Sequence, residues 1–230
     1  MINTAFNNTV FNSFTSVAPI SGAIEKTFDL KLDKSKKLKV SALAGSVIST
    51  SLSAAFIIKS NKSQKSLLKK ALTSNFASTK NLIIVGISSI IGGFIGGVAE
   101  DKKKNIWQKI KEMNFQVLSN VAFLLVFLNI FKKIGANLAK NSTKTVKNIV
   151  NFASVFGGVG AGAYVGSSIA DKINKQIIKP EIDYQRKLGA KDFLVHIDDL
   201  PVALALTNIP FIDKLIPFVL VSRGHEVGKQ

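Results

Sequence analysis

The chain has 230 residues, no cysteine and a formal net charge of +17, from 31 lysines and arginines against 14 acidic residues. Without cysteine, a disulfide framework, a thiolate metal site and a cysteine nucleophile are excluded. Only Arg186 and Arg223 are arginines. Because base readout and planar phosphate recognition favour arginine over lysine, we expect no nucleic-acid partner.

Residues 1–37 form a polar N-terminal segment that we expect to be loosely ordered. The segment lacks the basic start and the unbroken apolar core of a secretory signal, and it has no arginine of the kind that transit peptides carry. We therefore expect the first structured element to begin after it.

Four windows without any charged residue follow, at residues 40–58, 81–99, 113–131 and 148–170, and each is at least 19 residues long. As helices they would measure roughly 28 to 34 Å, which matches the ~30 Å hydrocarbon core of a bilayer. Their serine, threonine and asparagine residues are scattered and form no polar stripe. The windows predict an all-α integral membrane protein whose four transmembrane helices occupy residues 38–171. A soluble all-α protein with unusually buried helices is the alternative.

Charge also bears on the class of membrane protein. Since no charged residue lies in any window, a proton relay or a charge-coupled transporter is not favoured. The segments between the windows are rich in lysine, and basic residues at the ends of apolar helices attract anionic lipid. The lipid bilayer is thus the expected partner, and it accounts for much of the net charge.

Small residues recur at intervals of four in three of the windows. In a bilayer such stripes let two helix backbones approach closely, and we interpret them as glycine zippers. The third window differs, because its bulky stretch Phe123–Phe131 has no glycine and should face lipid or fill space. The predicted helix-packing residues are Gly45, Gly92, Gly93, Gly96, Gly97, Gly158, Gly162 and Gly166.

An internal similarity suggests how the four helices are arranged. Ser89–Gly97 aligns with Ser154–Gly162 at an offset of 65 residues. Each copy would be a hairpin of one helix, a lysine-rich loop and a glycine-rich helix, so the fold would contain two glycine-rich hairpins. Coincidence between two sequences of similar bias is the alternative.

The segment GVGAGA, Gly158–Ala163, also fits the G-x-G-x-x-G/A pattern of a dinucleotide-binding turn. Glu181 and Asp183 lie at about the ~20-residue distance expected of a ribose-binding carboxylate. No apolar strand precedes Asp183, however, and no alternation of strands and helices surrounds the motif. A soluble dinucleotide-binding enzyme is therefore a remote alternative.

Residues 172–230 form a mixed-charge tail. We predict two short helices in it, Leu200–Thr207 and Pro210–Ser222, with Gly224 as the C-cap. Asp213 and Lys214 would fall near mid-bilayer if this segment crossed, at about 2.5 to 3.5 kcal/mol each, so we expect interfacial helices that lie on the membrane surface or against the bundle.

The tail also contains the few residues that could carry catalysis. These are His196, Asp198, Asp199, His225 and Glu226, and they match no signature of a hydrolase or a metal site. Asp198 or Asp199 before Leu200-Pro201 is typical of a helix start. We therefore predict no catalytic, cofactor-binding or metal-binding residue.

These observations favour a non-enzymatic, multi-pass membrane protein that packs and self-associates, as a homo-oligomer, through its glycine zippers. A pore-forming or membrane-permeabilising protein is the alternative, because small residues around a common axis can line a pore. Lysines and arginines near the helix ends number 15 on the side of the termini and 11 on the other. This excess predicts cytoplasmic termini.

Overall fold

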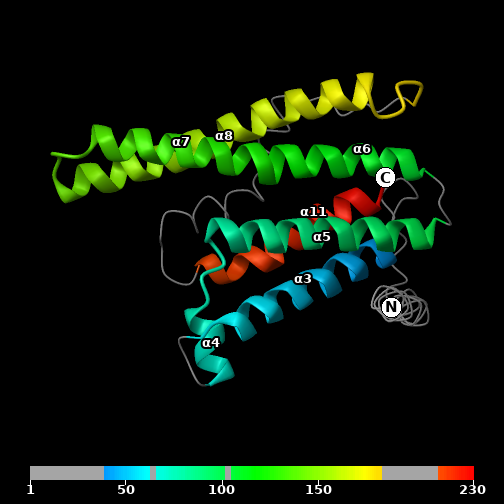
Figure 1. The fold of residues 1–230 in the computed structure, drawn as a ribbon, viewed down its shortest axis with the longest axis horizontal. Coiled ribbons are helices and arrows are strands. Elements are labelled where there is room, and N and C mark those ends of the chain that lie inside the picture. Colours follow the sequence, from blue (N-terminus) through cyan, green and yellow to red (C-terminus); the bar gives the residue numbers. More distant parts are fainter. Residues whose placement is uncertain (1–38, 63–65, 102–104, 183–211) are drawn as a thin grey trace, which may run out of the picture.

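The computed structural model describes residues 39–62, 66–101, 105–182 and 212–230; nearly all of these are helical and none is in a strand (Figure 1). The predicted all-α class is confirmed for these residues. The segment 1–37 and the predicted helix Leu200–Thr207 lie outside them. The helices are α3 (Val40–Ser60), α4 (Leu67–Thr73), α5 (Thr79–Glu100), α6 (Ile106–Val117), α7 (Phe123–Leu138), α8 (Lys144–Gln176) and α11 (Ile216–Gly228), with a π-helical turn η2 (Leu118–Ala122) and a 3₁₀ turn η4 (Ile212–Leu215).

Four helices are long and apolar enough to cross a membrane, as expected of a multi-pass membrane protein. They are α3, α5, the continuous helix Ile106–Leu138 formed by α6, η2 and α7, and α8. Each of them contains one of the charge-free windows. Ser78 and Thr143 cap α5 and α8, because their hydroxyl groups accept hydrogen bonds from Asn81 N and Val146 N in the first turn.

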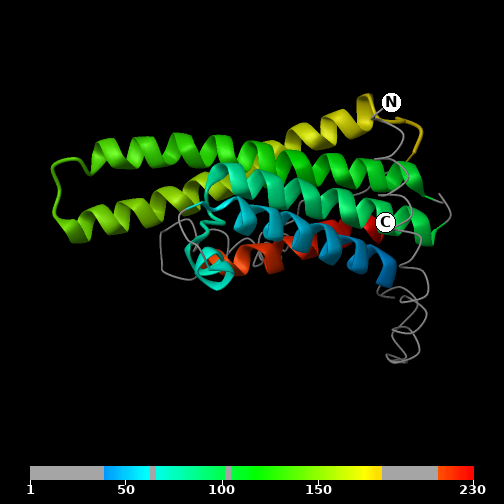
Figure 2. The ribbon, with the colours of Figure 1, turned by 60° about the horizontal axis from the view of Figure 1, so that its bottom comes forward.

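α3 and α5 run antiparallel, and α11 lies along both of them (Figures 1 and 2). One end of this group, which we call the Asp101 end, is where Lys39 pairs with Asp101. The opposite end, which we call the Ser74 end, is where the side chains of Asn61 and Lys214 approach Ser74. α11 begins near the Ser74 end and finishes at the Asp101 end.

The two 33-residue helices are longer than their neighbours, at about 50 Å each. Val121 lies against Gly86 of α5. From that level Leu138 is 17 residues further along its helix, whereas Thr79 is only 7 residues from Gly86. The α7–α8 hairpin therefore projects beyond the Ser74 end by about 15 Å, as Figures 1 and 2 show.

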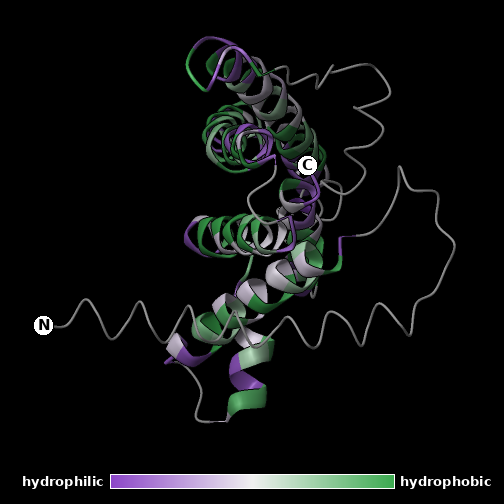
Figure 3. Ribbon diagram, turned by 90° about the vertical axis from the view of Figure 1, so that its right-hand side faces the viewer, coloured by the Kyte–Doolittle hydropathy of each residue, from purple (hydrophilic) through white to green (hydrophobic). Residues whose placement is uncertain are grey.

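Hydrophobic residues occur along all the long helices (Figure 3), and many of their side chains are exposed on the outside of the bundle. Val85, Ile90 and Phe115 are buried in the core, whereas Phe56 and Tyr164 are exposed by 60% and 70%. Further exposed apolar residues lie on α3, α5, α7 and α8. An outer surface of this kind is unfavourable in water and suits contact with lipid.

The start of the second predicted tail helix, Pro210, lies outside the described residues, and its end differs from the structure. A 3₁₀ turn starts at Ile212, the α-helix begins at Ile216, and it continues through Gly224 to Gly228. The prediction that Gly224 caps the helix is wrong. Gly224 is instead buried where α11 contacts α5, so the glycine serves close packing rather than a change of chain direction.

The positions of the helix termini at the Ser74 end and the Asp101 end can be tested by labelling single cysteines. The chain has no cysteine of its own, so only the introduced residue reacts. We expect Lys62→Cys and Ser142→Cys to react alike with a membrane-impermeant thiol reagent in sealed vesicles. Asn105→Cys, Glu181→Cys and Lys229→Cys should show the opposite accessibility, because they lie at the Asp101 end. Different reactivity of Lys62→Cys and Ser142→Cys would contradict four membrane crossings.

Candidate functional site

The contact between α3 and α5 is made by backbone atoms at glycine positions. A Cβ atom on Gly45 would collide with the carbonyl oxygen of Gly92, and one on Gly92 would lie 2.6 Å from the Ser49 Cβ. One turn further along α5, a Cβ on Gly96 would lie 2.7 Å from the carbonyl carbon of Ser41. Even alanine is too large at these three glycines, so the two helices touch along their backbones.

α5 makes a second contact of the same kind with α11. A Cβ on Gly93 would lie 2.7 Å from the Gly224 Cα, and one on Gly97 would lie 2.5 Å from the Gly228 Cα. Gly224 and Gly228 were not predicted to be packing residues. Their spacing of four, which equals that of Gly93 and Gly97, is the signal that could have found them.

Two buried serines join the three helices near Gly224. The hydroxyl groups of Ser46 on α3 and Ser89 on α5 are 2.8 Å apart. Ser46 Oγ lies 2.7 Å from the carbonyl oxygen of Val221, and Ser89 Oγ lies 2.6 Å from that of Leu220. Two hydroxyl protons serve these three contacts, so two of the contacts can be hydrogen bonds at one time. The serines thereby satisfy polar groups in an otherwise apolar centre.

The hairpin of α7 and α8 has its own glycine contacts. Cβ atoms on Gly158 and Gly162 would lie 2.8 Å from the Leu128 Cα and 2.6 Å from the Leu124 Cα. A Cβ on Gly166 would lie 2.7 Å from the Ser119 Cα, inside the π-helical turn. The π-helical turn accommodates one extra residue in the long helix at the level where Gly166 approaches it.

The same geometry bears on the dinucleotide motif. Gly158–Ala163 is continuous α-helix within α8, and Gly158 and Gly162 face α7 at backbone distance. A dinucleotide-binding turn needs a strand before the glycines and a free helix N-terminus at them. The described residues contain no strand, and α8 begins 14 residues earlier, at Lys144.

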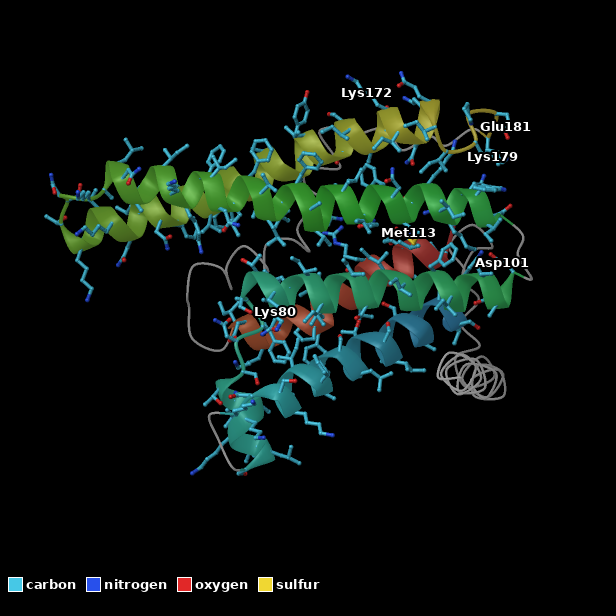
Figure 4. The ribbon with its side chains drawn as sticks, viewed as in Figure 1. Lys80, Asp101, Met113, Lys172, Lys179 and Glu181 are labelled. Atoms are coloured by element: carbon cyan, nitrogen blue, oxygen red, sulfur yellow. The ribbon has the colours of Figure 1, made fainter. Side chains whose placement is uncertain are left out.

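An ion cluster around Asp101, which is labelled in Figure 4, holds the last turn of α11 at the Asp101 end. Lys109 is fully buried; its Nζ lies 2.8 Å from Asp101 Oδ2 and donates to the carbonyl oxygens of Gly228 and Gln230. Lys39 Nζ pairs with the same carboxylate at 2.5 Å. Burial of Asp101 favours the neutral acid, but hydrogen bonds and charges from Lys109 and Lys39 prevail and hold its pKa below the ordinary 3.8.

The start of α11 is fixed in a similar way at the Ser74 end. Asp213 Oδ2 accepts a hydrogen bond from the backbone N–H of Phe76 at 3.2 Å, and Lys214 donates to the carbonyl oxygen of Ser74. Lys214 Nζ also lies 2.8 Å from Asp213 Oδ2. These residues, which would be costly in lipid, instead attach the helix to the loop before α5.

A row of polar side chains is buried along α6 and η2. Gln116 Nε2 donates to Glu112 Oε1 at 2.6 Å, Asn120 Nδ2 donates to Gln116 Oε1, and all three residues are less than 9% exposed. Asn120 Oδ1 has no hydrogen-bond partner among the described residues. On the α8 side, Asn174 Nδ2 donates to the carbonyl oxygen of Lys111 at 2.9 Å.

The third membrane helix was predicted at residues 113–131, and no charged residue was therefore expected in it. The helix begins at Ile106, so Lys109, Lys111 and Glu112 belong to it and are buried. The spacing of four between Glu112, Gln116 and Asn120 could have indicated a polar face. A charge-free window ends at the first charged residue, whether or not the helix continues beyond it.

The described residues bring only two of the candidate catalytic residues together, and the other three lie outside them. His196, Asp198 and Asp199 lie outside them, and His225 and Glu226 lie on α11. No group of three or more His, Cys, Asp or Glu residues able to hold a metal occurs among residues 39–62, 66–101, 105–182 and 212–230. No protein-family profile matches the chain, and neither curated proteins nor solved structures give a significant match.

Two alanine substitutions on α8 should change stability in opposite directions. Gly162→Ala places a Cβ 2.6 Å from the Leu124 Cα, and we expect it to destabilise the protein by about 1 to 3 kcal/mol. Gly160 is two residues away and therefore about 200° around the helix. Gly160→Ala should be neutral or stabilising by up to about 1 kcal/mol. Thermal unfolding in detergent, followed by circular dichroism, measures both; equal shifts would contradict the packing analysis.

The ion cluster predicts an acid-dependent loss of stability. Because the pKa of Asp101 is lower in the folded chain than its ordinary 3.8, the cluster stabilises the fold fully above that pH, and the contribution is lost as pH falls below it. Asp101→Asn should lower the melting temperature at pH ~7 and remove this part of the acid dependence. Asp171→Asn, which breaks the half-exposed pair with Lys175, is the control and should have little effect.

Proposed function

We propose that the chain is a non-enzymatic, multi-pass integral membrane protein whose helices pack through glycine zippers and which self-associates in the bilayer. The observation that carries the proposal is the combination of four apolar helices of membrane-spanning length with exposed apolar side chains on their outer faces. A surface of this kind needs lipid or another apolar partner around it.

The zippers explain how the helices hold together where no hydrophobic effect drives them together. In lipid, helix association depends on dispersion contacts and on interhelical hydrogen bonds. Backbone contact at Gly92 and Gly162 brings many atoms within range, and the Ser46–Ser89 pair adds hydrogen bonds. Glycine costs little helix stability there, because the backbone has no water to bond with.

Self-association requires a face that the internal contacts leave available. Gly158 and Gly162 pack against α7, and Gly166 packs against η2, within the same chain. Residues at intervals of four on another face of α8 form a second stripe, Phe152, Phe156, Gly160 and Tyr164, in which Phe152 and Tyr164 are 47% and 70% exposed. The Phe152 and Phe156 rings are in contact, with centroids 4.4 Å apart and their planes tilted by 33°. Gly160 thus forms a notch between aromatic side chains, which suits a second helix.

Permeabilisation of the membrane is the second candidate, and the buried row of Glu112, Gln116 and Asn120 is the observation that favours it. Polar side chains in membrane helices often border ion or water paths. The hydrogen bonds between these three residues account for much of their polarity within a closed bundle. We therefore place this function second.

The test of self-association uses the full chain in detergent and in liposomes. We expect the wild type to form cross-linked dimers or larger species, and Gly160→Leu to reduce them several-fold while leaving the melting temperature nearly unchanged. Ala55→Leu, which changes an exposed small residue of α3, is the matched control and should cross-link as the wild type does.

Equal cross-linking of Gly160→Leu and Ala55→Leu would remove α8 from the proposed interface. Extraction of the wild type from membranes by alkaline buffer without detergent would overturn the membrane location itself. Release of a trapped dye from liposomes by the wild type, but not by Gly160→Leu, would support the permeabilising alternative.

A further inference from the structure

An apolar groove opens between α3, α4 and α11 on the side of the Ser74 end. Its volume is about 470 Å³, within the ~300–1,000 Å³ range of ligand sites. The lining residues are mainly aliphatic and aromatic, with Thr50 and Ser51 at one end and Lys214 at the other. A groove with this distribution of polar groups suits an elongated apolar ligand with a charged head.

The length and direction of the groove relate it to one leaflet of a bilayer. Its wall on α3 extends from Val47 and Thr50, near the middle of that helix, to Ile58, two residues before its end. Val47 to Ile58 spans about 17 Å of helix. Half of a ~30 Å hydrocarbon core is about 15 Å. The groove thus runs from near the middle of the bilayer to its surface, as an acyl chain does.

The Ser74 end supplies the charge that a headgroup would meet. Six lysines and one acidic residue, Asp213, lie around the Ser74 end in the part of the chain that the structure describes. Asp213 forms an ion pair with Lys214. The lysines are Lys59, Lys62, Lys69, Lys70, Lys80 and Lys214. Such a cluster at a membrane surface attracts anionic lipids and has no preference for zwitterionic ones.

Helix α4 connects the groove to this charged surface. Its residues Leu67, Leu68 and Leu72 are 71%, 70% and 54% exposed and lie on one face, whereas Lys69 and Lys70 lie on another. A helix of this pattern lies in the interface, with leucines among acyl chains and lysines among headgroups. Ala71 and Leu72 form part of the groove wall, so the lysines beside them lie next to its outer end.

We propose that this groove binds one anionic phospholipid of the bilayer, with an acyl chain between α3 and α11 and its phosphate among the lysines of α4 and Lys214. The inference rests on the proposed membrane location. The inference goes beyond that location by naming a ligand class and a binding site. The bound lipid would fill the space between α3 and α11 and would hold α4 against the bundle.

The experiment measures lipid retention by the purified full chain. Detergent-solubilised protein is mixed with phosphatidylglycerol or with phosphatidylcholine of identical acyl chains, and bound lipids are counted by native mass spectrometry. We expect one phosphatidylglycerol to be retained with about a tenfold preference over phosphatidylcholine, and to raise the melting temperature. Lys69→Gln/Lys70→Gln should reduce the preference several-fold.

The groove itself is tested by filling it. Ser51→Trp places an indole in the groove from an exposed position of α3, and Leu52→Trp places one on the same helix at an exposed position that does not line the groove. We expect Ser51→Trp to reduce retention of phosphatidylglycerol about tenfold and Leu52→Trp to leave it unchanged. Leu72→Trp, which fills the groove from α4, serves as a second variant if Ser51→Trp does not fold.

The results separate this inference from the proposed function. Equal retention of the two lipids by the wild type, or equal retention by the groove variants and Leu52→Trp, would overturn the lipid site while the protein still requires detergent. A wild type that is soluble without detergent would overturn the membrane location instead. Headgroup preference that survives both groove variants would assign the lipid to the lysine surface alone.

Discussion

The close approach of three backbones at α5 is the constraint on which the rest of the bundle depends. Gly92 and Gly96 face α3, while Gly93 and Gly97 face α11. Adjacent residues on a helix point about 100° apart, so one run of paired glycines provides contact surfaces for two different helices. The contacts of Ser46 and Ser89 with each other and with α11 depend on this close approach, and so does the reach of the ion cluster at Asp101 to α11.

Polar chemistry in this fold is concentrated where helices meet and at their ends. Lys109 is fully buried, yet it contacts one carboxylate and two carbonyl oxygens, which replace the hydration it loses. Glu112 and Gln116 are buried one and two turns further along the same helix. The fold thereby carries charged side chains inside a bundle whose outer face is apolar, an arrangement opposite to that of a soluble protein and consistent with the proposed membrane location.

The helices themselves could be predicted from the sequence because hydropathy and length are local properties. Each charge-free window lies inside one long helix, and the all-α class follows from them. Which faces meet could not be predicted, because pairing such as Gly93 with Gly224 joins residues 131 positions apart and depends on the whole arrangement. Gly224 was predicted to be a C-cap because it lies in the polar segment Arg223–Glu226, which locally resembles the end of a helix.

The position of α11 has a consequence for the order of assembly. Lys39 bonds to Gln230 across 191 positions, and the glycines of α5 contact residues 224 and 228. A chain made from its N-terminus therefore has α3, α5 and α6 complete while the surface that receives α11 is still uncovered. Contacts of such long range also form late, since closing large loops is slow. The nascent protein thus passes through a stage with bare backbone grooves at Gly93 and Gly97, and synthesis of its last helix closes them. During that interval the same grooves can receive the corresponding helix of another copy, which makes exchange between chains an inherent hazard of biogenesis.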